Sequence, residues 1–156
     1  MNLEEISAMW FEDAHINVNK LHEESLRIPL LHQKYYDFYV DVKLSVSKLK
    51  EELKKFEVCL EDYMTNSMSQ EEVDKFVQWA AKKNVVLPDL NKKVLKPDIP
   101  KKIASNTYVI QMNLKIAETA EKAEYLKSII GMISSRSFQI RDAINFIQFQ
   151  AGMWSC

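Results

Sequence analysis

The sequence predicts an all-α protein whose long helices pack against other helices along their length. Glycine and proline are scarce, with 2 and 4 residues among 156, whereas a turn-rich β fold needs many of both. Apolar residues recur in alternating steps of four and three over residues 35–63 and again over 109–147. This is the heptad spacing of packed helices. A chain of this length provides for about one domain.

Two helix starts precede the first heptad stretch. Asn2 comes just before Glu4 and Glu5, and acidic side chains in a first turn stabilise a helix. Asn17 can cap a second helix, in which we expect Leu21 and Leu26 to point inward. We expect Pro29 to interrupt that helix, because proline lacks the backbone N–H that a helix interior needs.

The first heptad stretch predicts one long helix from His32 to about Met64. A polar run then ends the helix. Ser69, followed by Glu71 and Glu72, marks the start of another helix, because serine is a good N-cap. This shorter helix completes an N-terminal helical region, residues 1–81, which contains the candidate DNA-binding strip described below.

Residues 82–105 form a basic, proline-containing connector. Pro88, Pro97 and Pro100 prevent one continuous helix, and residues 82–102 contain seven lysines but only two aspartates. A connector of about 20 residues is usually functional or mobile. The connector joins the N-terminal region to a C-terminal helical region, residues 106–156.

The second heptad stretch predicts a helix that one chain would not cover. Continuous from Asn106, it would span about 68 Å, whereas a compact domain of this size has a radius of gyration of about 15 Å. The helix could break at Gly131 to Ser135, but the apolar stripe would remain. We therefore expect the stripe to contact other copies of the chain, through Val109, Met112, Ile116, Leu126, Ile130, Ile133, Ile140, Ile144 and Ile147.

No combination of residues predicts catalysis. The stretch "ISSRSFQIRDAIN" at 133–145 contains serines, but no histidine lies near it and no glycine-flanked nucleophile turn accompanies it. His15 and His22 lack the spacing of a helical zinc pair, and two glycines cannot build a phosphate-binding loop. We predict no catalytic residue, metal site or cofactor. Arg136 and Arg141 are expected to face solvent or an interface, with a phosphate or partner contact as the alternative.

Charge is grouped along the chain although the net charge is only -1. Lysines flank the first heptad stretch near Tyr63, and ammonium groups beside aromatic rings suit single-stranded DNA. Such lysines also commonly serve solubility alone. The predicted DNA-binding residues are Lys48, Lys50, Lys54, Lys55, Lys101 and Lys102.

The two cysteines, Cys59 and Cys156, lie far apart and fit no metal or redox spacing, which indicates a reducing cytoplasm. Residues 1–11 contain two acidic residues and no basic one, unlike a signal peptide, and no apolar run reaches 18 residues. We expect a protein of the cytoplasm.

Four segments together resemble one known family. They are "MNLEEI" at the start, "INVNKLHEESLRIPLLHQKYYDFY" at 16–39, "VLKPDI" at 94–99 and "AEYLKSIIGMISSRSFQIRDAINFIQFQAG" at 123–152. The chain resembles the UvsY recombination mediators of T-even-type tailed phages nearly from end to end. The last segment is the most specific.

The resemblance implies a protein without enzymatic activity that forms a homo-oligomeric helical ring of about six or seven subunits. Such proteins bind single-stranded DNA, help displace the phage single-strand-binding protein and load a RecA-like phage recombinase. They are made in the host cytoplasm and are not part of the virion. The alternative from charge alone is a coiled-coil scaffold or adaptor that binds only protein partners.

The chain departs from the family pattern at one place. Family members carry a basic pair just before a Tyr-Tyr-Ser/Thr-Gly turn, and this pair is linked to DNA binding. Alignment on Tyr63 places the pair at Val58 and Leu60, with Met64 and Asn66 replacing the second Tyr and the Gly. The DNA-binding prediction therefore moves to the lysines named above.

Overall fold

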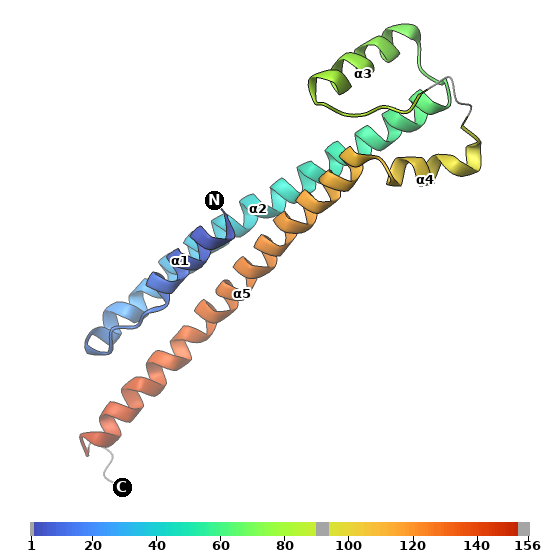
Figure 1. Cartoon of the computed structure of the whole chain (residues 1–156). Helices are drawn as coiled ribbons and strands as arrows, with labels where there is room; N and C mark the ends of the chain where they lie inside the picture. Colours follow the sequence, from blue (N-terminus) through green and yellow to red (C-terminus); the bar gives the residue numbers. More distant parts are fainter. Residues whose placement is uncertain (1, 90–93, 153–156) are drawn as a thin grey trace. The chain divides into compact units, whose positions relative to one another are not determined.

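The computed structural model describes residues 2–89 and 94–152, and these residues form helices joined by turns and loops (Figure 1). The all-α prediction is confirmed. The elements, in chain order, are α1 (Leu3–Ala14), the 3-10 turn η1 (Val18–Lys20), α2 (Leu21–Met64), α3 (Gln70–Lys82), the 3-10 turn η2 (Lys96–Asp98), α4 (Ile99–Ala104) and α5 (Thr107–Gln150).

The chain divides into two compact units. Unit 1 consists of Met1–Leu44 and Ala120–Cys156, and unit 2 of Ser45–Thr119. Helices α2 and α5 have 44 residues each and contribute to both units. The sequence instead predicts three consecutive regions, with boundaries at residues 81 and 105. That assignment of functions to regions remains a prediction.

Helix α2 is continuous through Pro29, so the predicted interruption is wrong. The missing N–H leaves the carbonyl of Ser25 without its helical partner, but Ser25 and Pro29 are both exposed and water can hydrate that carbonyl. Leu26 was also expected inside and is 74% exposed. Leu21 is buried, as expected.

Helix α5 is also continuous, and the alternative break at Gly131 to Ser135 is absent. The hydroxyls of Ser134 and Ser135 donate to the carbonyls of Ile130 and Met132, both at 2.9 Å. Serine side chains that bond to the preceding turn do not compete for the backbone as N-caps. The helix therefore runs through this point.

Within the connector, two of the three prolines begin helices. Pro97 lies at the start of η2, and Pro100 lies at the start of α4. Proline suits a first helical turn, because the N–H that it lacks would have no partner there. The predicted lysines Lys92 and Lys93 of the connector lie outside the described residues.

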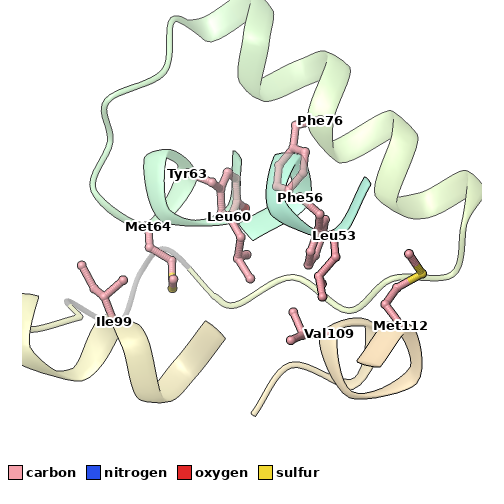
Figure 2. Close-up of a cluster of buried hydrophobic side chains, with 9 residues drawn as sticks. All are labelled: Leu53, Phe56, Leu60, Tyr63, Met64, Phe76, Ile99, Val109 and Met112. Carbon is pink, nitrogen blue, oxygen red and sulfur yellow. The ribbon is translucent and has the colours of Figure 1, made fainter. Parts of the chain in front are cut away.

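Each unit buries apolar side chains from the part of α5 that it contains. In unit 1, α1 supplies Ile6 and α2 supplies Leu31 and Tyr35. These pack with residues of α5, namely Leu126, Ile129 and Ile133. The core of unit 2 (Figure 2) joins α2, α3, α4 and α5 and consists of Leu53, Phe56, Leu60, Tyr63, Met64, Phe76, Ile99, Val109 and Met112.

These cores correct the argument that one chain could not cover the stripe of α5. Of the nine residues predicted to contact other copies, five are buried within the chain: Val109, Met112, Leu126, Ile133 and Ile140. Ile116 and Ile130 are half-buried. Only Ile144 and Ile147, at 37% and 47%, are exposed. The comparison of helix length with domain size failed because α2 is as long as α5 and has its own apolar side chains to pack against it.

Arg136 is the most deeply buried charged residue described in unit 1, with 2% exposure, which corrects its expected place in solvent or at a partner. Its Nη1 donates to the carbonyls of Asp13 and Ala14 at 3.1 and 3.2 Å. Its Nη2 donates to the carbonyl of His15 and to Glu24 Oε2, both at 2.8 Å. Three of these bonds cap the C-terminal end of α1 and the fourth pairs with Glu24, while Nε has no partner among the described residues.

A second charged cluster surrounds the buried carboxylate of Asp13. Arg27 Nη2 donates to Oδ1 at 2.7 Å, while Lys34 Nζ and Tyr35 Oη donate to Oδ2 at 2.6 and 3.0 Å. Burial raises the pKa of Asp13, but these donors and the charges of Lys34 and Arg27 outweigh burial and leave it below its ordinary value. Burial likewise raises the pKa of Glu24, and bonds from Arg136 and the Asn17 N–H outweigh that effect and lower it.

Replacing Arg136 by Met should destabilise the chain strongly. The substitution keeps most of the volume but removes the nearest cation from the buried Glu24, which then has only Arg27 at 3.9 Å, and breaking a buried ion pair costs about 3–5 kcal/mol. The free energy of unfolding in urea measures this loss. The matched control is Arg141→Met, whose side chain is 63% exposed and should change stability by less than about 0.5 kcal/mol. Equal effects of the two substitutions would contradict the capping role.

Acid should destabilise unit 1 through Asp13 and Glu24. Because their pKa values are lower folded than unfolded, the unfolded chain binds more protons in acid, and stability falls as pH drops below the ordinary values of 3.8 and 4.5. Unfolding measured from pH 7 to pH 3 should show this decline. Glu24→Gln should make the decline shallower, whereas the exposed Glu23→Gln should not. A decline unchanged by Glu24→Gln would refute the contribution of Glu24.

Candidate nucleic-acid interface

Basic side chains are concentrated in unit 2. Unit 2 contains 13 lysines against 11 acidic residues, whereas unit 1 contains 8 basic and 11 acidic residues. All six predicted DNA-binding lysines belong to unit 2 and are exposed. A polyanion is therefore attracted more favourably to unit 2 than to unit 1.

The four predicted lysines of α2 lie on two sides of the helix. At about 100° per residue, Lys50 and Lys54 lie on one flank of the buried seam, and Lys48 and Lys55 lie on the other. The α2 lysines are thus two pairs rather than one continuous strip. Lys55 forms an ion pair with Glu51 at 2.6 Å, and that hydrogen bond raises the pKa of Lys55.

One groove of unit 2 is open beside Lys54. It has a volume of about 480 Å³, and Lys54 and Val58 line it together with residues from the other two helices, Ile99, Pro100, Ile103 and Ala104 of α4 and Val109 and Asn113 of α5. Glu57 and Glu61 also lie at its wall. Lys54 therefore presents its charge in the same groove as Val58, where the family pattern has a basic residue.

A second groove of unit 2 contains Lys102. Its volume is about 340 Å³, and Leu60 and Met64 of α2 form its apolar floor. Asn106 shapes it: its Nδ2 donates to the carbonyl of Val86 at 3.0 Å, and its Oδ1 accepts from the Tyr108 N–H at 2.9 Å. The other predicted lysine of α4, Lys101, is exposed and lines neither groove.

The structure explains how this chain departs from the family pattern. Val58 is 50% exposed and could carry a basic side chain, but Leu60 is 1% exposed and lies in the core of unit 2. Asn66, which replaces the Gly of the family turn, has a φ of +54°. Asparagine tolerates this left-handed conformation better than most residues, so the chain adopts it here without glycine.

An aromatic cluster in unit 2 was not found from the sequence. It joins Phe56 of α2, Phe76 and Trp79 of α3, and Tyr108 of α5. Tyr108 Oη donates to Glu52 Oε1 at 3.1 Å, and burial together with this bond raises the pKa of Tyr108 to about 12. These residues come from three helices, so no local sequence pattern could have brought them together.

Over residues 2–89 and 94–152, no group of three or more metal-ligating side chains could hold a metal ion. None of the helices in the described part of the chain is long and apolar enough to span a bilayer.

Solved structures with a similar fold are those of a bacteriophage T4 protein. One crystal form of the T4 recombination mediator protein UvsY, lattice type II, has a TM-score of 0.74 and 15% sequence identity, over 97% of this chain and 98% of that chain. Lattice type IV gives a TM-score of 0.73 at 14% identity, covering 96% and 99%. At these identities the likeness establishes the fold. No curated protein sequence matches this chain.

A match at the level of sequence assigns the chain to a family. Residues 9–153 match the family described as "Recombination, repair and ssDNA binding protein UvsY". That range includes both long helices, both grooves of unit 2 and most of the segments that first indicated the resemblance. The chain belongs to the UvsY family of recombination, repair and single-stranded-DNA-binding proteins.

Proposed function

We propose that this protein binds single-stranded DNA through unit 2 and loads a RecA-like phage recombinase onto strand covered by the phage single-strand-binding protein. The observation that carries the proposal is the family membership of residues 9–153. Membership also confirms the prediction of a non-enzymatic recombination protein and argues against a scaffold that binds only proteins. The host cytoplasm, where phage DNA recombines, is the compartment that the proposal implies.

Within unit 2, we assign the leading DNA contacts to Lys54 and Lys102. Both line grooves, and their ammonium groups have no acidic partner in the described structure. Lysine is a point charge that suits phosphate without reading sequence. Lys48, Lys50, Lys55 and Lys101 are exposed and can add further phosphate contacts.

We also propose that copies of the chain assemble into a ring of about six or seven subunits through unit 1. Near its C-terminal end, α5 exposes apolar side chains on all sides: Phe138, Ile144, Phe146, Ile147 and Phe149 are 37% to 72% exposed. Exposed apolar side chains that gather in one place commonly mark a protein–protein contact. Assembly would also join several weak DNA sites, which can raise avidity about 100-fold or more.

Removing both groove lysines should weaken binding to single-stranded DNA. For Lys54→Gln with Lys102→Gln, the slope of log affinity against log salt should become shallower by about 0.7 for each phosphate that the variant no longer neutralises. Titration of fluorescent oligo-dT at several salt concentrations measures the slope. Lys127→Gln, at a 64% exposed side chain of unit 1, is the control and should leave the slope unchanged. An unchanged slope in the double variant would reject these two lysines, whereas no binding by the wild type would reject the function.

Charges placed on the exposed end of α5 should dissociate the oligomer. Ile147→Asp with Phe149→Asp puts carboxylates where copies would bury apolar surface, so native mass spectrometry should show an 18.3 kDa monomer in place of a multiple of that mass. Gln148→Asp, between the two positions, should leave the oligomer intact. A wild-type protein that is monomeric at micromolar concentration would overturn the ring.

A further inference from the structure

A pocket of unit 2 lies apart from both grooves that contain the leading lysines. Its volume is about 280 Å³, and it lies between α2 and α3. Its lining residues are Glu52, Lys55, Phe56, Cys59, Phe76 and Trp79. Pockets for drug-sized ligands have volumes of about 300–1,000 Å³, so this one suits a smaller group.

Aromatic rings hold the wall of this pocket in place. Phe76 and Trp79 are parallel to within 7° with ring centroids 6.0 Å apart, and Phe56 lies 5.6 Å from Trp79. Phe56 and Phe76 are almost fully buried in the core of unit 2, where Figure 2 shows them next to each other. Trp79 is only half-buried, so part of its indole remains open to a ligand. The wall is therefore apolar, and it carries a partly exposed ring.

Charged groups stand at the edge of the same pocket. Lys55 reaches it from α2, and its ion pair with Glu51 joins side chains that are 74% and 65% exposed. Such an exposed pair contributes little, so a phosphate can compete for the ammonium group. Glu52 offers a carboxylate that can accept a hydrogen bond from an N–H on the edge of a base.

We propose that the pocket bounded by Phe56, Phe76 and Trp79 takes up one unstacked nucleobase of single-stranded DNA, with Lys55 at the adjoining phosphate. The proposal rests on the proposed single-stranded-DNA binding. A nucleotide combines a planar apolar face with an anionic link, which matches an aromatic wall beside a lysine. An aliphatic side chain of a partner protein could fill the pocket, but it would bring no anionic group for Lys55. Every base has a π face, so this site binds strand of any sequence, as a mediator requires.

The fluorescence of Trp79 tests this contact directly. Trp10→Phe with Trp154→Phe leaves Trp79 as the only tryptophan among the 156 residues. Oligo-dT should quench its emission, because a stacked base contacts the indole. An abasic oligonucleotide of equal length has the same phosphates and no bases, so it should bind more weakly and leave the emission unchanged.

Filling the pocket provides a second test. Cys59 is half-buried at the wall, and Cys59→Phe would occupy the space without removing an aromatic ring. Stacking on one aromatic side chain changes affinity by about tenfold or more, so this variant should bind oligo-dT about tenfold more weakly. Its affinity for the abasic oligonucleotide should not change. Cys59→Ser keeps the pocket open and is the matched control.

The possible outcomes separate this inference from the proposed function. Binding of oligo-dT without any change in Trp79 emission, or equal affinity of the chain for both oligonucleotides, would overturn the base pocket and leave DNA binding intact. The absence of binding to either oligonucleotide would overturn both. The fluorescence test uses the unfilled pocket, so it remains decisive even if Cys59→Phe does not fold.

Discussion

The structure depends on the burial of two unusually long apolar seams, one on α2 and one on α5. A 44-residue helix is not stable in water by propensity alone, because most of its stability comes from packing of an apolar face. Helices α2 and α5 meet this requirement in two cores, one in each unit. In unit 1, α1 adds Ile6 and Trp10 to the cover, and in unit 2, α3 and α4 add Phe76 and Ile99. The short helices therefore complete cores that the long helices begin.

Charge provides the specific contacts that apolar packing lacks. Arg136 of α5 bonds to three carbonyl groups at the end of α1 and to Glu24 of α2, so three helices of unit 1 meet at one guanidinium. An apolar side chain could fill the same space but could not satisfy the end of α1. The bonds are directional, and they determine where α1 ends against its neighbours.

The surfaces of the two units differ in kind, and the difference bears on function. Unit 2 has excess lysine, open grooves and an accessible aromatic wall, which are the features that single-stranded DNA requires. Unit 1 has excess acid and carries the exposed apolar end of α5. This distribution fits the proposed roles of unit 2 in DNA binding and of unit 1 in self-assembly, in a chain whose family is described by recombination, repair and single-stranded-DNA binding.

The sequence by itself determined the helical class, the long heptad seams, the starts at Asn2 and Ser69 and the family, because these depend on local spacing and on recognisable segments. Only the tertiary structure decided which neighbour covers each seam. The heptad pattern of α5 is the same whether another copy or α2 packs against it, so Leu126 and Ile133 were assigned to the wrong kind of contact. Arg136 and the aromatic pocket were likewise beyond sequence reasoning, because their partners come from distant parts of the chain.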